Sequence, residues 1–292
     1  MGKKLIKNIE SFEKEFGEYF YDYILNTKEE EGFINKLSKV TELYVFGGLI
    51  RDFIISKEYY GIRNPEIKYK DVDIVLSTTN DDTRKLLDKF IIRENSFGGF
   101  KLKINNTRYD IWSLESTWGL KNYPQIPFDE RKTLINTSFF NNTAILYSIN
   151  DRKFIYDELF SKFYYDMILD IVFEVNPYPE LCIIKAMEYS SCYKKFNLRI
   201  SGRLRDYIVR YFESSKYKFE ETQINNYGTI KFDYNEINDF YFNLDEIIVE
   251  GMKKKSNQLN KSTQTSKAVK SYKHIDSISK KSFYKNYLGN IR

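Results

Sequence analysis

Apolar positions in the first part of the chain change from a helical to a strand-like spacing. In residues 4–26 they recur three and four apart, which predicts an amphipathic helix. Residues 31–39 are compatible with a second, short helix. Strands are then expected at 43–46, 72–76, 99–104 and 109–114, and helices near 49–57 and 80–90. Because strands and helices are mixed within this segment, it predicts an α/β or α+β domain with a small mixed sheet.

From about residue 155 the pattern becomes helical. Cys182, Ala186, Tyr189 and Tyr193 form one stripe at helical spacing, and another helix is expected to begin at Ser201 or Gly202. We therefore expect an α+β chain in four parts: an N-terminal helix packed on the first domain (1–27), a mixed-sheet domain (28–150), a helical domain (151–250) and a tail (251–292).

The positive charge of the chain is concentrated in its last segment. Residues 251–292 contain ten lysines, one arginine and a single acid, a net charge of +10, whereas the whole chain carries +5 and residues 1–250 therefore carry −5. Such blocks are usually solvated and without further function. The alternative is a phosphate-binding arm for nucleic acid, in which Tyr272, Phe283 and Tyr287 would stack on bases.

Histidine and cysteine usage excludes several chemistries. The single histidine, His274, lies in the tail, so residues 1–250 cannot form a Ser-His-Asp or Cys-His site. Cys182 and Cys192 form no metal or disulfide framework, and a reducing cytosol is the expected location. No apolar run approaches the roughly 20 residues of a membrane span, and no secretory signal is expected.

Two aspartates alternate with apolar residues in the run YKDVDIVLS (69–77). Residues two apart in a strand point to the same side, so Asp71 and Asp73 are expected side by side. Adjacent carboxylates repel unless a cation neutralises them, and Mg²⁺ favours a few carboxylates with substrate phosphates. A solvated acidic edge strand is the simpler interpretation of this pair alone. Asp110, in the strand-like run TRYDIWSL (107–114), adds a third acid and favours a metal site.

A glycine pair, Gly47 and Gly48, stands between the strand-like run 43–46 and the helix-like segment that follows it. The N-terminus of a helix offers unpaired N–H groups and a positive dipole, which together can hold a triphosphate. Glycines would let the backbone approach the phosphates closely, and Arg51 could add a cation. In two-metal catalysis, one ion activates the nucleophile and the other stabilises the leaving pyrophosphate.

Four motifs, in order, carry a resemblance to a known family. FGGLIRDFII…KDVDIVL resembles the head-domain signature of tRNA nucleotidyltransferases and bacterial poly(A) polymerases, within the polymerase-β-type nucleotidyltransferase superfamily. SFGGFKLKINNTRYDIW is similar to the family's F-G-T-V and third-carboxylate strands, and SFFNNTAILYS…KFIYDELF to its D-F-T-I-N-A-L and I-D-P segments. CIIKAMEYSSCYKKFNLRIS resembles the helical neck. The resemblance covers roughly residues 43–210.

The resemblance implies a nucleotidyltransferase head followed by a neck-like helical domain. It implies that Asp71, Asp73 and Asp110 are catalytic and bind Mg²⁺. The residues that it implies for nucleotide binding are Gly47, Gly48, Arg51, Asp52, Asn142 and Lys185. Lys185 is equally explained as an ordinary lysine on a helix face.

The chain departs from the family where the base and ribose are recognised. About 22 residues separate the glycine pair from Asp71, which predicts an extra loop. The family's R-R-D-F-T is replaced by NTSFF at 136–140, with Arg131 and Lys132 just upstream. In the neck, Pro179 and Cys182 stand where the family's base-reading Asp and Arg are expected. Base selection is therefore not expected to follow the family.

These features together predict transfer of a nucleoside monophosphate from an NTP, ATP or CTP, to a hydroxyl, with release of pyrophosphate. The expected acceptor is the 3′ end of an RNA such as tRNA, with the basic tail as a binding arm. A second hypothesis keeps the chemistry but transfers to a small molecule or a protein, as in defence or toxin enzymes. A third is a catalytically silent nucleotidyltransferase fold that binds RNA. Oligomeric state is not predicted.

Overall fold

The computed structural model describes residues 6–63, 65–67, 69, 71–95, 98–123 and 132–247. The basic tail, with His274 and the tail aromatics, lies outside these residues, as does Arg131. The chain divides into two compact units, Met1–Asp166 and Met167–Arg292. This division falls after the boundary expected at residue 150, so the strand and helix at 153–166 belong to unit 1.

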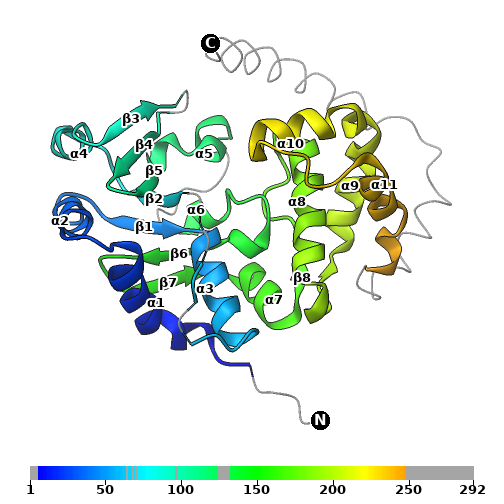
Figure 1. Ribbon diagram of the computed structural model, residues 1–292, viewed down its shortest axis with the longest axis horizontal. Helices are drawn as coiled ribbons and strands as arrows, with labels where there is room; N and C mark the ends of the chain where they lie inside the picture. Colours follow the sequence, from blue (N-terminus) through cyan, green and yellow to red (C-terminus); the bar gives the residue numbers. More distant parts are fainter. Residues whose placement is uncertain are drawn as a thin grey trace. The chain divides into compact units, whose positions relative to one another are not determined.

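The described part of unit 1 is built on a seven-stranded mixed sheet with the order β3-β4-β5-β2-β1-β6-β7 (Figure 1). Its strands are β1 (Leu43–Phe46), β2 (Val72–Leu76), β3 (Ile91–Glu94), β4 (Phe100–Ile104), β5 (Thr107–Ser113), β6 (Ile145–Ser148) and β7 (Lys153–Tyr156). Only β2 and β5 pair in parallel; the other neighbours are antiparallel. The α+β class expected from the sequence is confirmed.

The helices described in unit 1 are α1 (Glu13–Tyr19), α2 (Lys28–Leu37), α3 (Gly48–Glu58), α4 (Asp81–Leu87), α5 (Trp118–Asn122), α6 (Lys132–Ile135) and α7 (Glu158–Asp166). Helices pack along the sheet, with α3 against β1 and β6, and α1, α6 and α7 against β7. Phe33 of α2 meets Phe90 at 5.2 Å between ring centroids, and Arg84 of α4 stacks on Phe100 of β4. The alternate residues of β4 and β5 therefore face away from α2 and α4.

The N-terminal segment departs from the single helix expected over residues 4–26. It forms a 3-10 turn (Ile9–Phe12), the helix α1 and a π-helical turn (Phe20–Ile24), because spacings of three and four fit all three helix types. Phe16 lies 4.8 Å from the Tyr147 ring of β6 and 5.6 Å from Phe154 of β7. The segment thus packs on the sheet through an edge-to-face contact with Tyr147 and a tilted ring contact with Phe154.

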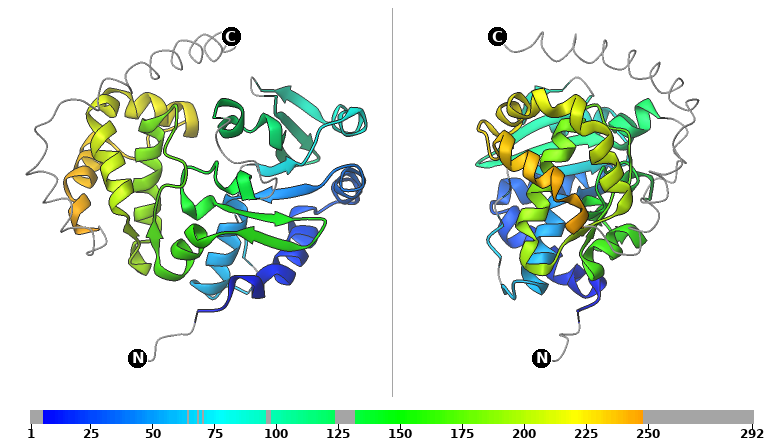
Figure 2. Two further views of the ribbon diagram at one scale, coloured as in Figure 1. Left: turned by 180° about the vertical axis from the view of Figure 1, so that it is seen from behind. Right: turned by 90° about the vertical axis from the view of Figure 1, so that its right-hand side faces the viewer.

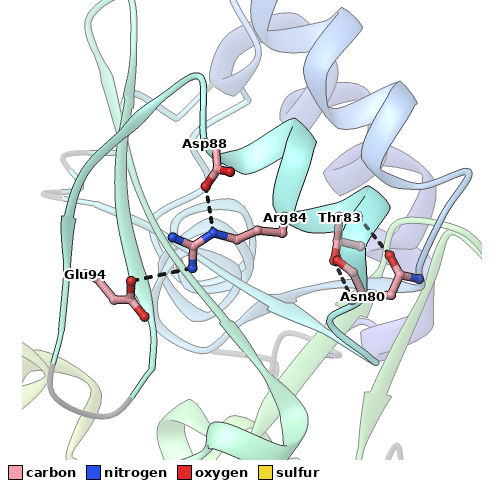
Figure 3. Close-up of polar contacts among 5 residues, drawn as sticks. All are labelled: Asn80, Thr83, Arg84, Asp88 and Glu94. Carbon is pink, nitrogen blue, oxygen red and sulfur yellow. Dashed lines mark hydrogen bonds and ion pairs between the residues drawn. The ribbon is translucent and has the colours of Figure 1, made fainter.

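Helix α4 is capped and tied to the outer strand by polar contacts (Figure 3). The Asn80 side chain accepts hydrogen bonds from the backbone N–H groups of Asp82 and Thr83, and the Thr83 hydroxyl in turn accepts from the Asn80 N–H. This arrangement is a capping box. Arg84 bonds Asp88 at 2.6 Å and reaches Glu94 of β3 at 3.5 Å.

The described part of unit 2 is a helical domain with one small parallel pair of strands, β8 (Ile168–Leu169) and β9 (Arg199–Ile200). Its helices are α8 (Pro179–Cys192), α9 (Gly202–Ser215), α10 (Phe219–Tyr227) and α11 (Tyr234–Phe242), and they lie side by side around α8 and α9 (Figure 2). The Ser201 hydroxyl accepts from the Leu204 N–H and caps α9, as expected from the sequence. Within the described ranges, no helix combines the length and the apolarity needed to cross a bilayer.

Candidate active site

The parallel pairing of β2 with β5 places two of the expected aspartates directly opposite each other. Asp73 and Asp110 are register partners, and Asp71 stands just before the first residue of β2. The alternate residues Val72 and Ile74 are fully buried, whereas the three aspartates are partly exposed. The strands thus bury their apolar side and turn the carboxylates toward the open side of the sheet.

A lysine that the sequence analysis did not single out lies among these carboxylates. Lys101 of β4 is the register partner of Asp110. Its Nζ donates to the two Asp110 carboxylate oxygens at 2.7 and 2.8 Å and lies 3.4 Å from Asp71 Oδ2. Burial lowers the pKa of Lys101, but the hydrogen bonds and charges of Asp110 and Asp71 outweigh burial and raise that pKa above its usual value. The ammonium therefore links the Asp110 carboxylate of β5 to the Asp71 carboxylate just before β2.

The donor set suits a hard cation, although the side chains are not arranged as a ready-made metal cluster. In the described ranges, no group of three or more His, Cys, Asp and Glu side chains converges closely enough to hold a metal. The carboxylates of Asp71, Asp73 and Asp110 nevertheless offer the oxygen ligands that Mg²⁺ prefers. The Lys101 ammonium already bridges two of these carboxylates, so the electrostatic environment there stabilises a cation. The residues fit Mg²⁺ in their chemistry.

The glycine pair forms the turn between β1 and α3. Gly47 has a φ of 70° and Gly48 is the first residue of α3, so the helix begins at once. A side chain at Gly47 would have its Cβ 3.5 Å from the Thr143 carbonyl, an ordinary contact, so the positive φ is what favours glycine. Val45 pairs with Ile74, and one further step of that register sets Phe46 opposite Asp73. The turn therefore lies beside the aspartate strand.

Arg51 and Asp52 pair with each other in the first turns of α3. Arg51 Nε and Nη2 donate to the two Asp52 carboxylate oxygens at 2.8 and 2.9 Å. The Arg51 side chain is only 11% exposed, so this two-point contact fixes the guanidinium against its own helix. Their predicted part in nucleotide binding stays a prediction.

Asn142 is a fully buried amide without a hydrogen-bond partner among the described residues. Both its Oδ1 and its Nδ2 are unpaired there, and such groups are costly. It lies in the 3-10 turn Asn141–Thr143, whose Thr143 is the nearest neighbour of Gly47. The Ser138 hydroxyl donates to the Thr143 carbonyl at 3.4 Å, which brings the NTSFF segment to the same place. Uncharged residues therefore occupy the motif position where the family has R-R-D.

Lys185 belongs to unit 2, where its ammonium lies 5.8 Å from the centre of the Tyr227 ring of α10. Lys231 lies over the same ring and pairs with Glu188 of α8 at 2.6 Å. These contacts give Lys185 a packing environment within unit 2. Cys182 is buried, and burial raises the pKa of its thiol well above the usual value. This thiol has the environment of a core residue.

A shallow hollow of about 190 Å³ opens at the carboxylates. It is lined by Asp71, Ile92, Lys101, Leu102, Arg108, Tyr109 and Asp110. A second hollow, of about 220 Å³, lies in unit 2 between the turn at 216–220 and α11 and contains none of the expected site residues. We consider the first to be the candidate site, because two of the expected aspartates, Asp71 and Asp110, line it.

Searches with the sequence found no matching family model and no matching curated protein. Solved structures do match the fold. A CCA-adding enzyme in complex with CTP has a TM-score of 0.54 at 15% identity, covering 83% of this chain and 56% of that one. A CCA-adding enzyme in apo form I gives 0.53 at 14%, covering 78% and 53%. The Thermotoga maritima CCA-adding enzyme complexed with tRNA gives 0.51 at 16%, covering 74% and 50%.

The chain thus spans between 50% and 56% of the length of these enzymes. The match covers most of the present chain, whereas the four motifs covered roughly residues 43–210. At these identities the likeness is one of fold. The resemblance expected from the four motifs is confirmed at that level: the chain shares the fold of the CCA-adding enzymes.

Proposed function

We propose that the protein is a Mg²⁺-dependent nucleotidyltransferase that moves a nucleoside monophosphate from an NTP to the 3′-hydroxyl of an RNA. The observation that carries this proposal is that the Lys101 ammonium contacts both Asp110 and Asp71. Asp73 is the register partner of Asp110, and these side chains lie beside the Gly47–Gly48 turn. The same arrangement stands on a fold shared with CCA-adding enzymes.

The triphosphate would lie at the N-terminus of α3. There the N–H groups of the first turn have no partners within the helix, and the helix dipole favours negative charge. Gly47 and Gly48 permit a close backbone approach. Asn142, with its buried and unpaired amide close behind this turn, would supply a donor and an acceptor to the nucleotide.

The carboxylates would act on the acceptor and on the charge of the phosphates. In the reaction, the acceptor hydroxyl oxygen forms a bond to the α-phosphorus, and the bond from that phosphorus to the β-phosphate oxygen breaks, releasing pyrophosphate. Asp110 would accept the hydroxyl proton. Mg²⁺, held by Asp71, Asp73 and Asp110, would supply charge stabilisation for the phosphates and lower the hydroxyl pKa. The altered NTSFF segment predicts that the base is selected by other contacts.

The test is transfer of label from each NTP to total RNA in the presence of Mg²⁺. Asp71→Asn/Asp73→Asn should lower the rate by at least about a hundredfold, because charge stabilisation in the transition state is lost. Asp82→Asn is the matched control, since Asp82 is an exposed carboxylate on α4. Label in protein or in small molecules would instead support the second hypothesis. A wild-type rate in the double variant would refute the proposed roles of both aspartates.

One observation favours the silent fold as a second candidate. Lys101 already neutralises Asp71 and Asp110, so the carboxylates are stabilised without a metal. In that case no nucleotide would be transferred from any NTP, while RNA binding would be unchanged in Asp71→Asn/Asp73→Asn.

A further inference from the structure

Basic side chains gather on the open face of the three outer strands, next to the carboxylates. Arg93 of β3 is the register partner of Lys101, and Lys103 of β4 is the register partner of Arg108. Residues directly opposite in a sheet share a face, and alternate residues of a strand do so too. Arg93, Lys101, Lys103 and Arg108 therefore lie on the same side as Asp110.

This arrangement is unfavourable unless an anion is present. Like charges directly opposite on neighbouring strands destabilise a sheet. Lys101 is compensated by Asp110 and Asp71. Arg93, Lys103 and Arg108 are exposed, and within the described ranges no acidic side chain pairs with them. We call these three residues the basic strip.

On the opposite side of the same strands, a cation is neutralised by acidic side chains. There Arg84 is held by Asp88 at 2.6 Å and by Glu94 at 3.5 Å (Figure 3). Arg84 also stacks on Phe100. The pairing of Glu94 with Phe100 places these contacts on the face away from Lys101. The sheet thus carries a cation with acidic partners on one side, and on the other side three cations that have no acidic partner among the residues the structure describes.

We propose that the basic strip binds the sugar-phosphate backbone of the single-stranded end of the acceptor RNA and leads its 3′ terminus to Asp110. Neighbouring strands are about 4.8 Å apart, so cations on β3, β4 and β5 extend across roughly 10 Å of surface. A row of cations at this spacing suits the successive phosphates of one strand. Ile92, 62% exposed, lies at the rim of the carboxylate hollow and offers an apolar contact for a sugar or base.

The shape of the hollow favours a polymer over an enclosed small molecule. At about 190 Å³ it is smaller than the roughly 300–1,000 Å³ of typical small-molecule pockets. Arg108 lines both the hollow and the strip, which makes the two continuous. The identity of the bound end as a substrate rests on the proposed function, but binding can be measured without transfer.

The test is the affinity of the full chain for a fluorescein-labelled single-stranded RNA, measured by anisotropy over a range of salt concentrations and without NTP. Arg93→Gln/Lys103→Gln/Arg108→Gln is compared with Lys36→Gln/Lys39→Gln/Lys89→Gln, which removes three exposed charges from the helical side of unit 1. Each lost phosphate contact lowers the salt slope by about 0.7, so the strip variant should lose about two units of slope and on the order of tenfold in affinity.

The control variant should keep the slope and affinity of the wild type. Equal behaviour of the two triple variants would overturn the proposal, and so would competition by polyglutamate as effective as that by unlabelled RNA. Unchanged circular dichroism and melting temperature would show that the strip variant is folded.

A second measurement locates the bound end. RNA carrying 4-thiouridine near its 3′ terminus should crosslink to peptides that contain β3, β4 and β5, and the strip variant should lose these crosslinks. Crosslinks confined to other peptides would contradict the proposal. Binding at the strip without any nucleotide transfer would refute the proposed function alone, whereas transfer that does not depend on the strip would refute this inference alone.

Discussion

At the scale of single residues, the chemistry of the site depends on which cation contacts the carboxylate oxygens of the aspartates. Lys101 Nζ lies 2.7 Å from one Asp110 oxygen, closer than the 3.4 Å to Asp71. An ammonium in this place stabilises the carboxylates, and it also competes with any divalent ion for the same oxygens. The charge balance of the site is therefore set by one side chain from β4.

Lys101→Met tests this competition directly. Without the ammonium, the affinity for Mn²⁺, used as a probe, should rise because the ion no longer competes with a positive charge. The rise should be on the order of tenfold and no more, because solvent partly screens the contact between the ammonium and the carboxylates. Mn²⁺ binding is measured by titration calorimetry without NTP or RNA. Lys103→Met is the control, as it removes a lysine from the same face of β4 that has no acidic partner in the described ranges. Unchanged or weaker Mn²⁺ binding in Lys101→Met would show that the ammonium and the ion do not compete.

At the scale of elements, the β1–α3 turn has a backbone requirement that α2 lacks. Gly47→Ala should lower the free energy of unfolding by about 1–3 kcal/mol, because alanine is strained at a φ of 70° and a ψ of −114°. Gly32→Ala, in the interior of α2 with no atom within 4 Å of the added Cβ, should raise it by about 0.5–1 kcal/mol. Urea unfolding of the two variants measures both changes. A neutral Gly47→Ala would mean that the turn relaxes to a different conformation.

The sequence predicted the elements in which local pattern and burial agree. The strands expected at 43–46 and 72–76 coincide with β1 and β2, because the apolar run at 43–46 ends at Gly47 and the alternating run at 72–76 begins directly after Asp71. β6 was missed because it is buried throughout and has no alternation, and β3 because it is an edge strand that is mostly exposed.

The candidate site could likewise be predicted only where a local sequence pattern marks its residues. Asp71, Asp73 and Asp110 could be proposed from alternation and motif, since each lies in a run with a clear period. Lys101 and the basic strip could not be, because their positions depend on the register of β4 against β3 and β5. Register is a relation between strands, and no local pattern in β4 reports it.

At the scale of the whole molecule, net charge and binding surface are separate properties. Residues 1–250 carry −5, and a binding site for a polyanion would not be sought there from charge alone. The sheet nevertheless places three cations, which have no acidic partner in the described part of the chain, together beside three aspartates. Distribution over a surface, rather than the sum, determines where an anion is attracted.

The many buried tyrosines predict that both units lose stability at alkaline pH. Burial raises the pKa of Tyr19, Tyr59 and Tyr147 to about 12, and raises the pKa of Tyr109 and Tyr207 further. An unfolded tyrosine releases its proton near pH 10. Above that pH the unfolded state therefore binds fewer protons than the folded state, and stability falls as pH rises.

Tyr147→Phe isolates one such group. Between about pH 10 and pH 12 the folded chain keeps the Tyr147 proton and the unfolded chain loses it, which lowers the free energy of unfolding by about 1.4 kcal/mol per pH unit. Tyr147→Phe lacks this proton, so its free energy of unfolding should fall less steeply with pH by that amount. Near neutral pH it should be close to the wild type or more stable, because the buried Tyr147 hydroxyl has no hydrogen-bond partner among the described residues. Calorimetric unfolding across this range is the measurement. Tyr217→Phe, at a position 86% exposed, is the control and should follow the wild type. Equal slopes for Tyr147→Phe and the wild type would show that this phenol reaches water before the chain unfolds.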